Sequence, residues 1–146
     1  MAYRDQKRIM LSDSFEHVEN KMASTDVYPG MLLELNSDDK VIPHNEADEI
    51  AVGLFALEDA LQGNTVSDVY EEDNPVSIGI PRKGCRVWAL VTDDETYAPG
   101  DYLASNGDGA LKKVTATGSE YKLAQVIEDL EVESGAGNTH IQVRVV

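Results

Sequence analysis

Apolar and polar residues alternate in short runs through the last four fifths of the chain, and turn residues separate the runs. The runs that predict strands cover residues 31–35, 40–42, 75–80, 85–92, 102–105, 110–114, 121–130 and 139–146. Pro, Gly, Asn and Asp stand between them, and these residues supply the φ angles that tight turns need. Short strands at this spacing indicate an all-β fold, a small antiparallel barrel or sandwich with less than about a fifth of the chain helical.

Two of these runs carry the clearest patterns. Residues 85–92 are apolar on both faces, which is typical of a strand at the centre of a sheet. Residues 139–146 alternate cleanly, which predicts a strand with one face inward. Its inward positions are Ile141, Val143 and Val145, and its outward positions are His140, Gln142 and Arg144. Between these runs, residues 106–109 read Asn-Gly-Asp-Gly, the composition of a tight hairpin turn.

Residues 48–61 fit two interpretations. Ile50, Leu54, Leu57 and Leu61 have helical spacing, whereas residues 51–57 form a continuous apolar run that suits a buried strand. Gly53 weakens the helix by about 1 kcal/mol. The pattern alone leaves helix and strand equally open.

The first 27 residues differ from the rest of the chain, because their apolar side chains are too sparse to predict a core. The turn at Tyr28-Pro29-Gly30 marks the change, so we expect an extended N-terminal arm over residues 1–27 and a β domain over residues 28–146. Apolar anchors and a basic tip could attach such an arm to a partner, and the β domain should then fold without it. The candidate binding residues are Tyr3, Arg4, Lys7, Arg8, Ile9, Leu11 and Phe15. The alternatives are an arm that packs along its own barrel, exchanges between subunits or stays disordered.

Charge narrows the choice of partners. The chain holds 27 acidic and 12 basic residues for a net charge of −15, so it should repel nucleic acid and anionic membranes. No apolar stretch approaches the roughly 20 residues that cross a bilayer, and the first residues lack the apolar core of a secretory signal. We therefore expect synthesis in a cytoplasm and no membrane or nucleic-acid partner.

Candidate chemistry is sparse. The three histidines have no common ligand spacing, and Cys85 is the single cysteine, so neither a zinc site nor a disulfide within the chain is expected. The acidic run at residues 93–95 and the hairpin at 106–109 could bind a cation only weakly, since the ligand set of an EF-hand is incomplete. Phosphate-binding and nucleophile-elbow motifs do not occur. We predict no catalytic residues, no metal and no cofactor.

An ordered set of segments from Gly30 onward resembles the capsid cement, or decoration, proteins of tailed bacteriophages. The segments are the strand and return at 30–42, the apolar segment 51–56, Asp59-Ala60-Leu61-Gln62-Gly63 with a downstream Tyr70, residues 85–91, Ala98-Pro99-Gly100-Asp101-Tyr102-Leu103, Gly109-Ala110-Leu111, the strand at 122–127 and the terminal strand. The resemblance implies a β-tulip-like barrel. It also implies that residues 51–57 form a strand, with only a short helical turn near 58–62.

The resemblance further implies a protein on the outer surface of the capsid in the virion. Its partners would be the major capsid protein and itself, as a homotrimer, and it would stabilise contacts between capsid subunits. Two other classes remain open. One is a structural component of the tail or baseplate, and the other is a small β-barrel nucleotide hydrolase with its active site at a subunit interface. Location in the virion and stabilisation by nucleotide, respectively, would distinguish them.

Overall fold

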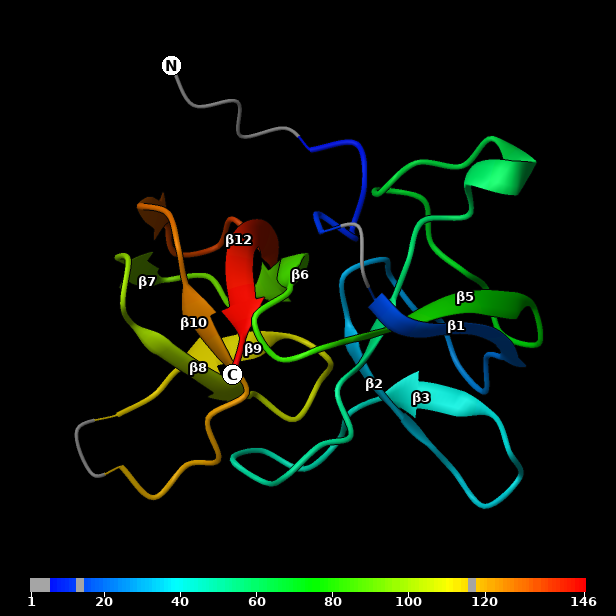
Figure 1. Cartoon of the computed structure of the whole chain (residues 1–146), viewed down its shortest axis with the longest axis horizontal. Coiled ribbons are helices and arrows are strands. Elements are labelled where there is room, and N and C mark those ends of the chain that lie inside the picture. The colour runs from blue at the N-terminus through cyan, green and yellow to red at the C-terminus, as the bar shows by residue number, and fades with distance from the viewer. Residues whose placement is uncertain (1–5, 13–14, 116–117) are drawn as a thin grey trace.

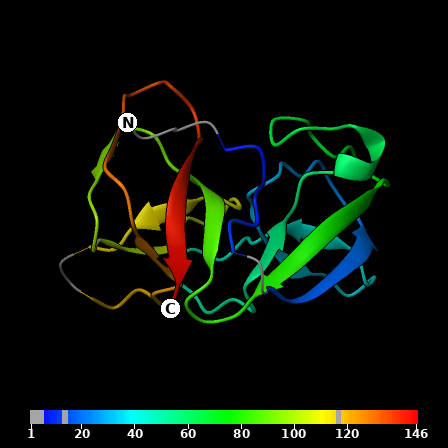
Figure 2. The same ribbon diagram turned by 45° about the horizontal axis from the view of Figure 1, so that its top comes forward.

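The chain builds two β structures that lie side by side. The computed structural model describes residues 6–12, 15–115 and 118–146. A five-stranded sheet occupies one half of the molecule and a closed barrel the other (Figure 1). Figure 2 shows the same division from a second direction, with β1 and β5 on the sheet side and β6 and β12 on the barrel side.

The five-stranded sheet is antiparallel and has the order β1-β5-β4-β2-β3. Its strands are β1 (Phe15–Met22), β2 (Leu32–Leu35), β3 (Val41–Pro43), β4 (Leu54–Ala56) and β5 (Pro75–Pro81). β1 and β3 are the edge strands of this sheet. The strands predicted at 31–35, 40–42 and 75–80 are thereby confirmed.

The barrel closes in the order β10-β12-β6-β9-β8. Its strands are β6 (Arg86–Val91), β8 (Tyr102–Ser105), β9 (Leu111–Lys113), β10 (Ala124–Val126) and β12 (Thr139–Val145). The all-β barrel is confirmed, and so is the hairpin, because the Asn106 N–H donates to the Ala110 carbonyl at 3.0 Å. One pairing departs from the antiparallel prediction: β6 meets β9 in parallel, at Val91 and Leu111.

Residues 121–130 do not form one strand. β10 ends at Val126, and β11 (Leu130–Val132) leaves the barrel to pair with β7 (Glu95–Tyr97) as a separate ribbon. The split follows the register of the partners, because β10 pairs with β12 and β8 only over residues 124–126. The apolar pattern continues across the break because β11 also buries a valine, Val132.

The ambiguous segment contains a strand followed by a short turn of helix, as the resemblance implies, but the strand covers only residues 54–56 of the predicted 51–57, and Val52 is 80% exposed. β4 is completely buried, and the 3-10 helix η1 (Ala60–Gln62) follows it. The helical stripe fails because Ile50 is 65% exposed and Leu61 is 98% exposed. Ile50 and Leu61 are the first and last residues of the apolar pattern with helical spacing, so the segment does not bury one face of a helix.

Each half of the molecule has its own hydrophobic core. The barrel core includes Val87, Leu103, Leu111, Ile141 and Val143. The core of the sheet is a second cluster built on its inner face. Burial of this apolar area is the main source of stability, since the chain has no disulfide.

The N-terminal residues belong to both halves. Met10 forms an isolated antiparallel bridge with Val87 of β6, and Ile9 is completely buried in the barrel core. β1 then runs along β5 from Phe15 to Met22 with one register shift. The β structure of residues 28–146 is therefore not complete without the segment predicted as an arm.

Candidate docking pocket

A pocket of about 750 Å³ opens beside residues 6–10, between the barrel strands β6 and β12 and the chain that follows β4. Its walls come from residues 6–10, from the chain that leaves β4, from the loop 64–67, and from β6 and β12. This volume lies within the range of small-molecule and peptide sites, roughly 300–1,000 Å³. Five segments from different parts of the chain thus meet at one concave surface.

The floor of the pocket is a pair of stacked rings. The Trp88 and His140 rings lie 5.7 Å apart between centroids and are inclined by only 6°. Nε2 of His140 lies 2.9 Å from the carbonyl oxygen of Pro29, which fixes the ring between the two halves of the molecule. His140 does lie on the outward face of β12, as predicted, but this face meets the Pro29-Gly30 turn and is only partly exposed.

Gly30 makes this close approach possible. Its φ angle is +92°, and a Cβ there would lie 2.8 Å from the His140 ring and 2.9 Å from the Trp88 carbonyl oxygen. Glycine tolerates both the left-handed backbone and the missing space. The turn predicted from the sequence therefore also positions the pocket floor.

One wall consists of the N-terminal segment, held by backbone hydrogen bonds. The Ile9 N–H donates to Oε1 of Glu58 at 3.1 Å, and the Trp88 N–H donates to the Ile9 carbonyl at 2.8 Å. The Leu11 N–H donates to the Arg86 carbonyl at 3.1 Å, so this segment follows the edge of β6. Lys7 and Arg8 precede it, are exposed, and line the pocket.

A hydroxyl behind the opposite wall fixes the chain that leaves β4. The Tyr70 hydroxyl donates to the carbonyl of Leu57, a residue that lines the pocket. Burial raises the pKa of Tyr70 to about 12, more than a nearby backbone hydrogen bond lowers it. Tyr70 is therefore a neutral donor at ordinary pH.

The seven candidate binding residues lie in different environments and do not form one site. Lys7 and Arg8 meet at the pocket, whereas Ile9 is buried in the core and is not available to a partner. Leu11 and Phe15 pack against the barrel core, and Phe15 lies on Gly79, where a Cβ would come within 2.6 Å of its ring. The remaining two, Tyr3 and Arg4, lie outside the described residues. The sequence did not reveal Trp88 and His140 as partners, since nothing in it shows that their strands share a floor.

A buried serine and histidine lie close together elsewhere, and they stabilise a turn. Nδ1 of His44 is 2.6 Å from the Ser105 hydroxyl, and its Nε2 is 3.2 Å from the Ile50 carbonyl oxygen. The Ser105 oxygen also accepts the Gly107 N–H at 3.2 Å. Both side chains are buried, so these atoms are engaged inside the protein rather than presented to a substrate.

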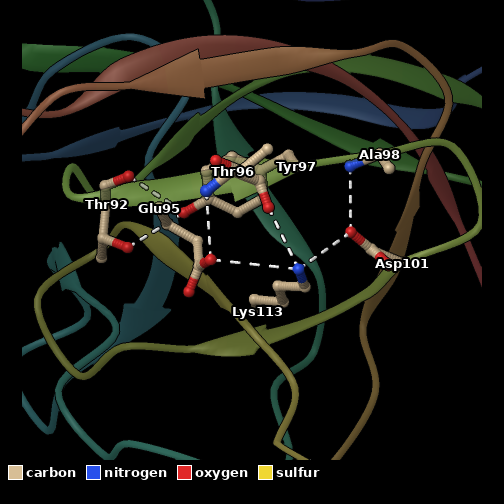
Figure 3. Close-up of polar contacts among 7 residues, drawn as sticks. All are labelled: Thr92, Glu95, Thr96, Tyr97, Ala98, Asp101 and Lys113. Atoms are coloured by element: carbon tan, nitrogen blue, oxygen red, sulfur yellow. Dashed lines mark hydrogen bonds and ion pairs between the residues drawn. The ribbon is translucent and has the colours of Figure 1, made fainter.

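A third polar cluster attaches the β7–β11 ribbon to the barrel (Figure 3). Nζ of Lys113 donates to the Thr96 carbonyl at 3.0 Å and lies 3.4 Å from Oδ2 of Asp101. The Tyr97 hydroxyl donates to the Thr92 carbonyl at 2.9 Å, and burial raises the pKa of Tyr97. The contacts in Figure 3 join β7 to Lys113 of β9 and to the loops on either side of β7, so they hold the ribbon against the barrel.

Metal and membrane chemistry can be assessed for the described part of the chain. Within residues 6–12, 15–115 and 118–146, no three His, Cys, Asp or Glu side chains are placed to hold a metal ion. In the same residues, no helix is long and apolar enough to cross a membrane.

The fold defines a class of protein: an all-β chain in which a five-stranded sheet is joined to a small closed barrel. A similar fold occurs in a solved structure, the N base of head fiber protein gp8.5 of bacteriophage phi29. The match has a TM-score of 0.59 at 9% sequence identity, and it covers 89% of this chain and 93% of that chain. Comparisons with protein-family models and with curated proteins gave no match.

Proposed function

We propose that this protein is a structural component of a bacteriophage head that acts by binding protein surfaces rather than by catalysis. The observation that carries the proposal is the fold, which is shared over most of both chains with the base of a phage head fiber. The sequence resemblance to capsid cement proteins also indicates a location on the phage head. A net charge of −15 suits a protein that must not adhere to DNA.

The finer form of the proposal is a cement protein on the outer surface of the capsid. It would bind the major capsid protein and assemble as a homotrimer, adding interface between neighbouring subunits. Many copies of one modest contact would raise the stability of the shell, because each bound copy favours the assembled state. The candidate residues available for such contacts are Lys7 and Arg8, while Tyr3 and Arg4 remain predictions from the sequence.

A second candidate is the base of a fiber that projects from the head. The specific observation in its favour is the neighbour itself, which is the base of a head fiber. A cement protein is expected at capsomer junctions over the whole shell, whereas a fiber base carries a projecting structure.

Purified phage particles distinguish these proposals. Heads and tails separated from disrupted virions should carry the protein in the head fraction, at a stoichiometry set by the capsid lattice. Electron microscopy of labelled particles then shows whether it lies flat between capsomers or at the foot of a fiber. Recovery in the tail or baseplate fraction alone would refute a role in the head. Light scattering of the free protein tests the trimer.

A further inference from the structure

We propose that the pocket beside Trp88 and His140 binds an extended acidic peptide segment of a protein partner, with Lys7 and Arg8 as its charge-recognition residues. The inference rests on the proposed function, since the partner would be another protein of the head. It changes the role of the N-terminal segment from an anchor inserted into a partner to one wall of a receptor.

The first argument is the charge at the pocket mouth. Most described lysines lie beside carboxylates of their own chain. These pairs are Lys21–Asp39, Lys40–Asp73, Lys112–Asp48 and Lys113–Asp101. Within the described residues, Lys7 and Arg8 have no such carboxylate, and both side chains are exposed at the pocket. Two adjacent unpaired cations on a chain of net charge −15 mark a place where an anionic group is favoured.

Two acidic side chains near the pocket, Glu58 and Asp68, accept hydrogen bonds within the chain. Oε1 of Glu58 accepts the Ile9 N–H from the pocket wall. Just after the loop 64–67, Oδ2 of Asp68 accepts two hydrogen bonds from Thr65, from its N–H at 2.6 Å and from its side-chain hydroxyl at 3.1 Å. These bonds hold both carboxylates to groups of their own chain, a backbone N–H in each case and the Thr65 hydroxyl as well for Asp68.

The second argument is the chemistry of the pocket surface. The partly exposed His140 ring, stacked on Trp88 that is itself only 4% exposed, forms its floor, and Met10 and Val66 add apolar surface. Asn64, Thr65 and Ser67 supply polar groups on the loop side. Arginine is among the residues that most often dominate the binding energy of protein interfaces, and Arg8 is exposed at this pocket. A peptide that alternates acidic and apolar side chains would match both the floor and the mouth.

Isolated protein and a labelled peptide test this directly. The probe is a short fluorescein-labelled peptide of alternating glutamate and leucine, and its anisotropy is measured during titration with the full chain. Saturable binding is expected, accompanied by a change in the fluorescence of Trp88, the only tryptophan in the sequence. A peptide in which serine replaces glutamate should bind much more weakly, because it keeps the leucines but lacks the charge that Lys7 and Arg8 would recognise.

Matched variants locate the site. The double variant K7E/R8E should weaken peptide binding by about tenfold or more, because two attractive contacts become repulsive. The double variant K83E/R144E makes the same change in net charge at exposed cations near the far end of β12 from His140, and it should weaken binding less than about twofold. Ser67→Phe, an exposed position on the pocket wall, should block binding without loss of a core contact.

Three results would overturn the inference. They are no saturable binding of the peptide, equal weakening by the two double variants, and stronger competition by single-stranded DNA or inorganic phosphate than by unlabelled peptide. Decoration of purified heads separates this failure from that of the proposed function. If K7E/R8E binds heads as the natural chain does, the pocket inference fails and the head role stands. If the peptide binds but heads do not, the head role fails.

Discussion

Replacing Ile9 with alanine tests whether the N-terminal segment is part of the folded structure. Ile9 is completely buried in the barrel core, and its backbone is bonded on both sides, to Glu58 and to Trp88. The substitution removes about three methyl or methylene groups at about 0.8 kcal/mol each. A residual cavity adds to this, so the free energy of unfolding should fall by about 3–4 kcal/mol.

Chemical denaturation measures this change, with far-UV circular dichroism as the signal. A loss of about 3 kcal/mol should lower the urea midpoint by about 1–2 M and the melting temperature by about 6–12 °C. Ile9→Val should cost only about 1 kcal/mol. Met22→Ala is the matched control in the same segment, because Met22 is 42% exposed and should shift the midpoint little.

The alternative is a segment that folds only on a partner. In that case Ile9→Ala and Met22→Ala would have equal and negligible effects on the isolated protein. Such a result would refute the reasoning from burial. A fold that survives deletion of residues 2–27 would refute it as well, since that deletion removes both Ile9 and β1.

Three further substitutions test other features. Gly30→Ala should lower the free energy of unfolding by about 2 kcal/mol or more, measured by thermal unfolding, because its Cβ would meet the pocket floor. The control Gly63→Ala, also at positive φ but with open space around it, should lower it by only about 1 kcal/mol. Similar losses in the two variants would show that the pocket floor tolerates the methyl group. The folded-state pKa of Tyr70 is about 12 against an ordinary value of 10.0, so its contribution is complete below pH 10 and is lost as the pH rises towards 12. Tyr70→Phe should therefore flatten the fall in stability over this range, by at most about 3 kcal/mol, and an unchanged pH profile would contradict the burial argument. Ser105→Ala should lower the free energy of unfolding by about 1–3 kcal/mol, since it leaves buried polar groups of His44 and the turn unpaired; an unaltered denaturation midpoint would argue against that network.

Most of the strands could be predicted from the sequence because each buries at least one face, whereas β1 lies in the predicted arm and β7 was not predicted as a strand. Alternation at Ile141 and Val143 identified β12, and apolar residues on both faces identified β6 as a central strand. The pairing of these strands could not be predicted in the same way. The parallel contact of Val91 with Leu111 depends on how the barrel closes, which local patterns do not encode.

The sequence predicted the basic residues of the candidate pocket but not the aromatic residues beside them. Lys7 and Arg8 stood out as a basic cluster, but their position beside Trp88 depends on backbone bonds between segments far apart in the chain. His140 appeared as an outward residue of a strand, and an outward residue can face either water or a second sheet. The single buried Ile9 was too little apolar pattern to predict that its segment belongs to the core.

The course of the chain has a consequence for the order of folding. The first described residues complete the edge of β6, the chain then builds the sheet from residues 15–81, and only afterwards does it return to build the barrel. During synthesis, Met10 has no strand partner until β6 emerges, and the barrel cannot close until β12 is made. The sheet can form first, while an apolar N-terminal segment stays exposed to solvent or chaperones. Because loop closure precedes these distant contacts, barrel formation should be the slow phase of refolding, on the scale of milliseconds to seconds.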